Sequence, residues 1–331
     1  MSRVSFVRVE LPCLALLAFC LAGPAAAETF TTFTVPDAAS INTVSVGSSG
    51  AVTGSYVDAQ GVRHGFVRAP DGTIATFDPE GSVRTEPSGI DKTGKIVGTW
   101  ADSGSQNHGF VRDPDGTITE FDARQANLTS VAAIHGKIVG VFRRDGRRFF
   151  GFLRSRGGRL ESFHYPEARF TVPTSINGVE VVAGYYQNSD LVLHGFIRNA
   201  DGSFVPVDPP GTFGTFPAGI NRDGTVTGRY SGVGGEHGFV RAADGTFVSF
   251  DVAGAIGTAA WGINTDGTIA GTYLDANQHN QGFIRDPDGT LTTFGVPDAV
   301  STSPASINNK GLIAGDYSNQ DGSGGSFVRV P

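Results

Sequence analysis

A short motif recurs seven times along this chain of 331 residues, and the repeat restricts the possible folds more than any other feature. The motif is Gly-Phe-apolar-Arg, with Ser in place of Gly in the last copy. Its phenylalanines are 44, 42, 44, 43, 44 and 44 residues apart. They are Phe66, Phe110, Phe152, Phe196, Phe239, Phe283 and Phe327. A fixed period of about 20 to 50 residues is typical of solenoids, propellers and other repeat arrays.

Each repeat unit is predicted to contain four short strands, which we name A to D. A second motif, Gly-x-aromatic, also recurs seven times in phase with the first, from Gly54-x-Tyr56 to Gly315-x-Tyr317. In the second unit the strands are expected at 89–91 (A), 95–100 (B), 108–113 (C) and 117–122 (D). The A–B turn Asp91-Lys92-Thr93-Gly94 and the C–D turn Asp113-Pro114-Asp115-Gly116 are typical of hairpin loops with a left-handed glycine.

A four-stranded unit of this length, repeated seven times, predicts an all-β fold: a seven-bladed β-propeller of four-stranded antiparallel blades. The 47 glycines argue against a helical protein, because glycine weakens the interior of a helix. A β-solenoid is the alternative, but its rungs are usually half this length or less.

The two ends of the repeat array predict how the ring closes. The seventh copy stops at Pro331, which aligns with Pro287 of the C–D turn, so the last blade lacks strand D. Residues 29–33 align with 290–294 and can supply it. We therefore expect one domain over residues 28–331, in which the N-terminal strand 28–35 completes blade 7 and removes an open sheet edge.

Residues 1–27 have the features of a secretory signal peptide. Arg3 and Arg8 precede an apolar run over 11–22, and Ala25-x-Ala27 suits cleavage before Glu28. Twelve apolar residues are too few to span a bilayer, so we expect no transmembrane segment and export to the periplasm or the medium. The run before Cys20 resembles a lipoprotein signal only loosely. Both cysteines lie in this segment, which excludes disulfides, a cysteine nucleophile and thiolate metal sites from the mature chain.

The repeated stretches also carry a family resemblance. His-Gly-Phe-Val-Arg-x-x-Asp-Gly-Thr and Gly-Ile-Asn-x-x-Gly-x-x-x-Gly resemble the bacterial extracellular repeat called the HAF family, over the whole mature chain. The resemblance implies export and a propeller-like array, and it implies no established activity. The Trp-Asp dipeptide of WD40 repeats and the double glycine of kelch repeats do not recur.

Several polar residues repeat with the blades, and we interpret them as structural. Hairpin register pairs four histidines with four aspartates: His64/Asp78, His108/Asp122, His194/Asp208 and His237/Asp251. In the other units both members of the pair change together, which indicates a cross-strand contact rather than metal ligands. The same register places Phe77 over Gly65. The seven arginines of the first motif are expected to bond nearby turns. We expect no metal and no cofactor.

Threonines recur eight positions after the strand D aromatic, and we expect them to ring one mouth of the central channel. They are Thr85, Thr129, Thr171, Thr215, Thr258 and Thr302. Two interpretations remain open: backbone bonding at the start of strand A, or a polar rim for a ligand.

The unrepeated residues carry the candidate site. Strand alternation places the D–A and B–C loops on one face, and these loops vary in length, so we expect any site there. Six arginines gather around blade 3, and aromatic residues follow in the next D–A loops. The candidates are Arg124, Arg143, Arg144, Arg147, Arg148 and Arg169, with Tyr165, Phe170, Phe213, Phe216 and Trp261. Arginine beside aromatic rings would suit an acidic sugar polymer. A solvated hairpin with aromatic loop anchors is the alternative.

The function predicted from these features is an exported, non-catalytic binding propeller, monomeric, with an acidic glycan or other cell-surface polymer as its partner. The alternative is a propeller-type polysaccharide lyase or hydrolase, which needs a general acid and base. The unrepeated candidates for those roles are Glu80, Glu86, Glu167, His135, His164 and His279, and no acid–base pair stands out among them. A net charge of −7 makes nucleic acid an unsuitable partner.

Overall fold

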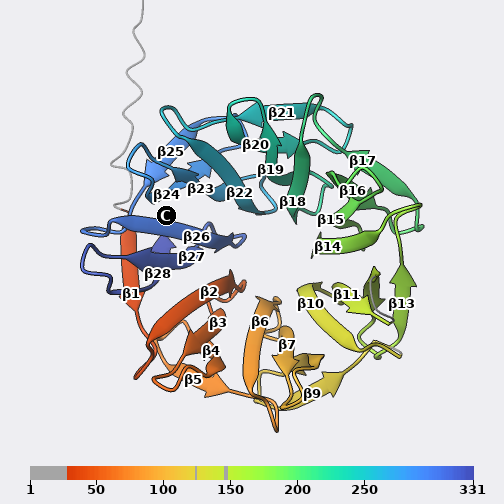
Figure 1. The fold of residues 1–331 in the computed structure, drawn as a ribbon. Coiled ribbons are helices and arrows are strands. Elements are labelled where there is room, and N and C mark those ends of the chain that lie inside the picture. The colour runs from red at the N-terminus through yellow and green to blue at the C-terminus, as the bar shows by residue number, and fades with distance from the viewer. Residues whose placement is uncertain (1–27, 124, 145–147) are drawn as a thin grey trace, which may run out of the picture.

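Seven four-stranded blades surround a central channel in the computed structural model, which describes residues 28–123, 125–144 and 148–331 (Figure 1). The strands of blades 1 to 3 are β2 (Ser40–Val46), β3 (Val52–Val57), β4 (Arg63–Arg68), β5 (Ile74–Phe77), β6 (Arg84–Ile90), β7 (Ile96–Ala101), β8 (Asn107–Arg112), β9 (Ile118–Phe121), β10 (Leu128–His135), β11 (Lys137–Arg143), β12 (Phe149–Arg154) and β13 (Leu160–Phe163).

Blades 4 to 7 repeat this order, and the last blade takes its outer strand from the start of the chain. Their strands are β14 (Phe170–Ile176), β15 (Val182–Gln187), β16 (Leu193–Arg198), β17 (Phe204–Val207), β18 (Gly214–Ile220), β19 (Val226–Gly232), β20 (Gly235–Arg241), β21 (Phe247–Phe250), β22 (Gly257–Ile263), β23 (Ile269–Leu274), β24 (Asn280–Arg285), β25 (Leu291–Phe294), β26 (Ser301–Ile307), β27 (Ile313–Ser318), β28 (Gly324–Val330) and β1 (Thr29–Phe33).

The first strand of each blade lines the channel and the fourth lies outermost (Figure 1). Within each blade, neighbouring strands pair antiparallel in sequence order, as expected. In blade 7 the outer position is taken by β1, whose residues pair with β28 from Thr29↔Val330 to Phe33↔Ser326. The predicted closure of the ring by an N-terminal strand is therefore confirmed.

The channel-lining strands are longer than the sequence predicted. In blade 2, β6 begins at Arg84, whereas strand A was expected at 89–91. The register shifts between Pro87 and Gly89, so Ser88 forms a bulge, and the channel-lining strands of all six other blades shift at the same place. A bulge interrupts the two-residue alternation, which explains why the sequence pattern marked only the end of the strand.

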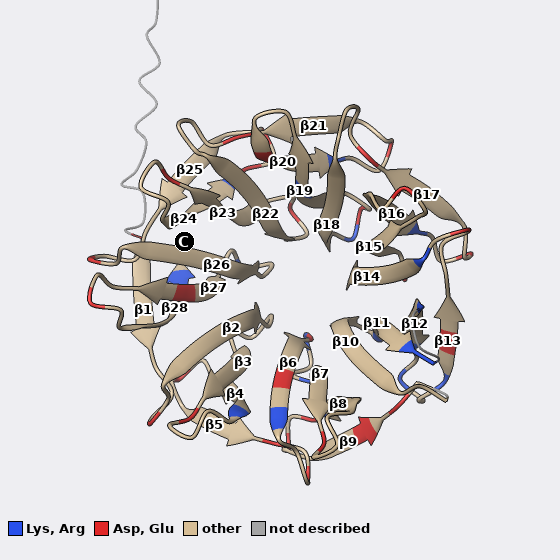
Figure 2. Ribbon diagram, viewed as in Figure 1, with Lys and Arg blue, Asp and Glu red and all other residues tan. Residues whose placement is uncertain are grey.

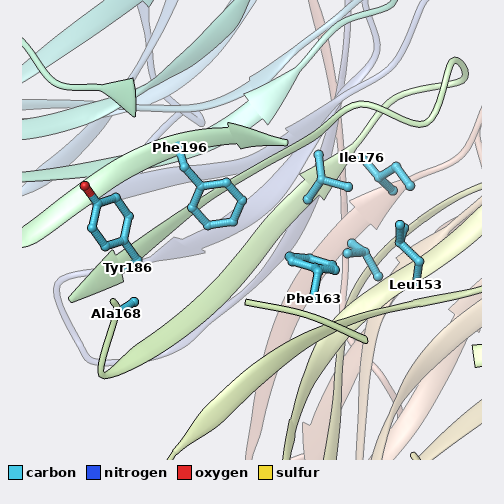
Figure 3. Packing of buried hydrophobic residues seen from close by; sticks show 8 residues of the cluster. Leu153, Phe163, Ala168, Ile176, Tyr186 and Phe196 are labelled. Atoms are coloured by element: carbon cyan, nitrogen blue, oxygen red, sulfur yellow. The ribbon is translucent and has the colours of Figure 1, made fainter. Parts of the chain in front are cut away.

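The core lies between the blades and consists largely of repeated phenylalanines. All seven phenylalanines of the first motif are fully buried. Phe77 covers Gly65 across the β4–β5 pair, as predicted, and a Cβ on Gly65 would lie 2.7 Å from the ring. Figure 3 shows one such cluster, in which Leu153 and Phe163 of blade 3 lie near Phe196 of blade 4. Each blade therefore completes the core of its neighbour.

The repeated arginines also join neighbouring blades. Arg112 donates a hydrogen bond to the carbonyl of Asp113 in the C–D turn at 3.3 Å, as predicted for this position. Its guanidinium also lies 4.9 Å from the ring centre of Phe77 in the preceding blade. The same cation–π contact recurs in five further blades. Among the described residues, Arg241 of blade 5 makes no such contact, because Val207 of blade 4 occupies the position of the ring.

The repeated threonines do not ring a channel mouth, contrary to the expectation. All six are at most 1% exposed. The hydroxyl of Thr171 accepts a hydrogen bond from the backbone N–H of Tyr165 at 2.9 Å, and Thr302 accepts one from Val296 at 2.9 Å. Thr129 and Thr258 accept equivalent bonds, whereas Thr85 and Thr215 bond side-chain oxygens of the same loop. These contacts hold the D–A loop against the start of the channel-lining strand, so local bonding, through the backbone in four of the six, is the correct interpretation.

Candidate functional site

The arginines of blade 3 lie where β11 ends and β12 begins. Arg143 is the last residue of β11, bonds Asn127 at 3.3 Å and lies 5.6 Å from the ring centre of Phe149. Arg144 and Arg148 are exposed in the loop, and Arg144 lies 5.6 Å from the ring of Phe142. Figure 2 shows basic segments on and around β12.

The structure describes one of the three remaining predicted arginines. Arg169 is exposed and directly precedes β14, which packs against β11 of blade 3. Arg124 and Arg147 lie outside the described residues. Four of the six predicted arginines are therefore placed, all of them on the face that carries the D–A and B–C loops.

Blade 3 also lacks the histidine–aspartate pair found in other blades. In blade 2, Nδ1 of His108 lies 2.9 Å from Asp122, and the ring stacks on Trp100. Equivalent pairs occur at His64, His194 and His237, which confirms the predicted register. In blade 3 the aspartate position is taken by His164. Burial and then the charge of Arg148 lower the pKa of His164, so this position adds no negative charge beside the arginines.

Aromatic side chains of blades 4 to 6 form a continuous row around the channel. Phe170 lies 6.4 Å from Tyr185, and Tyr185 lies 5.6 Å from Phe216, both edge-on. The guanidinium of Arg229 then lies 4.8 Å from the ring centre of Phe216 and 4.9 Å from that of Trp261. Phe170, Phe216 and Trp261 were predicted in the D–A loops, but the structure places them on the channel-lining strands β14, β18 and β22, because these strands begin earlier than the sequence pattern indicated. It does bring the three predicted residues together in one row.

Two predicted aromatic residues do not join this row. Tyr165 stacks on Tyr186 at 3.7 Å and packs against the buried cluster of blades 3 and 4. Phe213 is 66% exposed and precedes β18. Tyr165 therefore serves the core, as the alternative interpretation held for aromatic loop anchors.

Arg229 and Tyr185 belong to the row but were missed from the sequence. Both occupy the middle position of the Gly-x-aromatic motif, which varies from blade to blade. Burial raises the pKa of Tyr185, while the charge of Arg229 opposes that rise. Arg229 also pairs with Glu236 at 3.1 Å. The sequence did contain a signal for Arg229. The middle position of the Gly-x-aromatic motif is Ser, Thr, Val, Tyr or Asp in the other blades, so arginine is the exception there.

The same motif position holds a half-buried carboxylate in blade 7. Asp316 accepts hydrogen bonds from the backbone N–H of Thr43 at 2.9 and 3.0 Å and from the hydroxyl of Ser326 at 2.8 Å. It lines a cavity of about 210 Å³ between blades 7 and 1. Burial raises the pKa of Asp316 to about 6, although these hydrogen bonds oppose the rise.

The candidates for acid–base chemistry are scattered. Glu86 on β6 lies 3.6 Å from Arg63 and 3.7 Å from Arg84, so its carboxylate is flanked by two cations. His135 ends β10 on the opposite face, where burial and the charge of Lys92 lower its pKa. Within the described residues, no hydrogen bond or ion pair joins Glu86 or His135 to any other of these candidates, which are Glu80, Glu167, His164 and His279.

A cavity of about 520 Å³ opens on the face opposite to the predicted site, where the A–B turns meet. Aliphatic residues at the ends of the channel-lining strands, such as Ile90 and Ile220, line it. The side-chain amides of Asn177 and Asn308 link adjacent turns by donating to the carbonyls of Asn221 and Gly47, both at 2.9 Å. The sequence predicted only short, uniform turns here and gave no sign of this cavity.

Two kinds of feature are absent from the residues that the structure describes. No helix there is long and apolar enough to cross a membrane. Over the same ranges, no group of three or more histidine, aspartate or glutamate side chains is arranged to hold a metal ion.

Comparison with solved structures defines the class of this protein as a β-propeller. A streptogramin B lyase aligns with a TM-score of 0.60 at 13% identity, covering 91% of this chain and 97% of the lyase. Virginiamycin B lyase from Staphylococcus aureus gives a TM-score of 0.59 at 11% identity, with 92% and 99% covered. The β-propeller domain of the Trilobed protease from Pyrococcus furiosus gives 0.62 at 12%, with 87% and 95% covered.

These similarities show the fold alone, because the identities are low. No family model and no curated protein matches this sequence. The lyase and protease activities therefore belong to those other proteins.

Proposed function

We propose that this protein is an exported, non-catalytic binding propeller for an acidic sugar polymer, held across the face of the D–A and B–C loops and the adjoining channel wall. The observation that carries the proposal is the placement of Arg229 between Phe216 and Trp261. Flat aromatic faces pack against sugar rings, and a guanidinium among them pairs with a carboxylate or sulfate. The aromatic row of blades 4 to 6 thus combines both kinds of contact that an acidic sugar needs.

The arginines of blade 3 extend this surface. Arg169 directly precedes Phe170, the first ring of the row, and the exposed Arg144 and Arg148 lie in the adjacent blade. A polymer, unlike a single sugar, can span both parts. Blade 3 also has His164 in place of the strand D aspartate, so this position adds no negative charge where the polymer would meet the arginines.

Export and family membership form part of the same proposal. The signal-like residues 1–27 support secretion to the periplasm or medium, and the repeated His-Gly-Phe-Val-Arg stretch supports a HAF-type repeat protein. An exported protein meets acidic polymers of cell surfaces directly, which is consistent with a binding role.

Retention on immobilised polygalacturonate, alginate and neutral dextran tests the proposal. We expect the mature protein to bind the two acidic polymers at low salt and to bind dextran weakly, with affinity falling as salt rises. Trp261→Ala should remove the stacking contact, and R143E/R144E/R148E should weaken binding at least tenfold without lowering the melting temperature. Lys92→Glu, on the opposite face, is the matched charge-reversal control and should bind as the wild type does.

Three outcomes would contradict the proposal. Equal retention on dextran would show that charge does not contribute to binding. Unchanged binding by the Trp261 variant would show that the aromatic row does not contact the polymer. Release of new chain ends from either acidic polymer would indicate the alternative function, a polysaccharide lyase or hydrolase.

A further inference from the structure

Blade 3 departs from the other blades in its A–B turn, on the face opposite to the proposed polymer site. Elsewhere this turn contains four residues, such as Asp91-Lys92-Thr93-Gly94. In blade 3, β10 ends at His135 and β11 begins at Lys137, so Gly136 alone connects them. The unit is shorter by two residues, which explains the phenylalanine spacing of 42 at this point.

The shortened turn leaves a gap in blade 3. In other blades the longer A–B turn fills the equivalent space. The left-handed glycine of the A–B turn normally faces the C–D turn of its own blade. A Cβ on Gly94 would lie 3.5 Å from Pro114, and one on Gly267 would lie 3.5 Å from Pro287. A Cβ on Gly136 would meet nothing within 4 Å. The two turns of blade 3 therefore do not cover one another.

A cavity of about 310 Å³ occupies this place, between blades 2 and 3. A smaller cavity of about 130 Å³ adjoins it through Asp91, Gly136 and Arg156. The smaller cavity also shares Lys92 and His135 with the 520 Å³ cavity at the channel mouth. The cavities therefore adjoin one another in a series from the channel mouth to the space between blades 2 and 3. We call the two smaller cavities the blade 2–3 groove.

The walls of the larger cavity combine apolar and cationic side chains. Val111, Ile134 and Ile138 supply the apolar part. Arg154 and Arg156 supply positive charge, while Lys95, also in the wall, is paired with Asp113. Asp91 lines the wall as well, but its carboxylate accepts hydrogen bonds from the backbone N–H groups of Thr93 and Lys95 in its own turn.

Arg154 differs from the equivalent arginines of other blades. Its guanidinium lies 4.5 Å from the ring centre of Phe121, but no hydrogen bond or ion pair of Arg154 is found in the part of the chain that the structure describes. In blade 2 the C–D turn places the carboxylate of Asp115 near the equivalent Arg112. Blade 3 has Gly157 at that position, so its C–D turn offers no carboxylate to Arg154. The guanidinium of Arg154 can therefore pair with the carboxylate of a ligand.

We infer that the blade 2–3 groove is a second binding site, for a small organic carboxylate with an apolar body. The apolar part would pack on Ile134, Ile138 and Val111, and the carboxylate would pair with Arg154 and Arg156. A guanidinium is the side chain best suited to bind a carboxylate through two parallel hydrogen bonds. A volume of about 310 Å³ suits a ligand of roughly the size of a bicyclic aromatic acid.

Calorimetric titration with naphthalene-2-carboxylate, and with the neutral 2-naphthalenemethanol as its partner, tests this inference. We expect saturable binding of the carboxylate at millimolar concentration or below, and at least tenfold weaker binding of the alcohol. R156E should lower the affinity for the carboxylate at least tenfold. R159E is the matched control, because Arg159 lies just beyond the same turn and is exposed but does not line the groove.

A second variant tests the shortened turn itself. Replacing His135-Gly136 with the four-residue turn Asn-Arg-Asp-Gly of blade 5 should close the gap and abolish binding of the carboxylate. Polymer binding on the opposite face should be unchanged in all these variants. Absence of saturable binding, equal binding of the alcohol, or wild-type affinity in both R156E and the turn variant would overturn the inference.

Discussion

Replacing Asp316 with Asn should make the ring more stable at neutral pH and should change how its stability depends on pH. The carboxylate lies at the junction between blades 7 and 1, where it accepts two hydrogen bonds from the backbone N–H of Thr43. Burial raises its pKa from 3.8 to about 6. Because the folded state holds this proton more tightly than the unfolded state, the wild type should lose stability as the pH rises from about 4 to about 6.

The size of the effect follows from the pKa. A rise of about two units corresponds to about 3 kcal/mol, since one unit corresponds to about 1.4 kcal/mol. Relaxation around a half-buried group reduces this figure, so we expect about 1 to 3 kcal/mol. Asn resembles the protonated carboxyl, so the difference between variant and wild type should be small near pH 4 and should reach this size near pH 7.

Urea denaturation at several pH values between 4 and 7 measures this difference without adding salt. A direct check is the ¹³C shift of the Asp316 carboxyl, whose titration midpoint should lie near 6. Asp321→Asn is the matched control, because Asp321 is exposed and its pKa is lowered, so its contribution changes only below about pH 4. A difference between D316N and wild type that stays constant from pH 4 to 7 would refute the reasoning.

Three further predictions concern the repeat. Deleting Thr29–Phe33 should expose the edge of β28 and lower the melting temperature or cause aggregation, and an unchanged melting temperature would rule out the closure. His108→Ala and Asp122→Ala should be coupled by at least about 0.5 kcal/mol in a double-mutant cycle, and strict additivity would reject the pair. Their coupling should weaken above neutral pH, since the folded-state pKa of His108 is raised and its charge is lost there. Gly109→Ala should cost at least about 1 kcal/mol of unfolding free energy, because a Cβ would lie 2.5 Å from Phe121, and wild-type urea stability would refute the clash.

The repeat made the blades predictable because each hairpin is short and its register is set by a glycine turn. Counting outward from the C–D turn therefore placed His108 opposite Asp122 and Phe77 opposite Gly65, and both pairs are present. Contacts within one blade could be predicted in this way, since they depend on chain distances of a few residues.

Contacts between blades could not be predicted by the same counting. Arg112 reaches over Phe77 of the preceding blade, and Arg229 lies between rings of its own blade and the next. Such contacts depend on the angle between neighbouring blades around the channel. The spacing of the repeats in the sequence does not specify that angle. The candidate site was accordingly predicted only in part: Phe216 and Trp261 were identified, while Arg229 was missed.

The pairing of β1 with β28 has a consequence for the order of folding. Every other strand pairs with a strand close to it in the chain, whereas Thr29 pairs with Val330, about 300 residues away. Loop-closure entropy grows with the logarithm of chain separation, so joining these ends costs about 3 kcal/mol more than closing a hairpin of about 14 residues. Blades 1 to 6 can form from consecutive residues before this cost is met. The junction between blades 7 and 1 should therefore form last, from an open arc of folded blades, and its closure should set the folding rate of the whole ring.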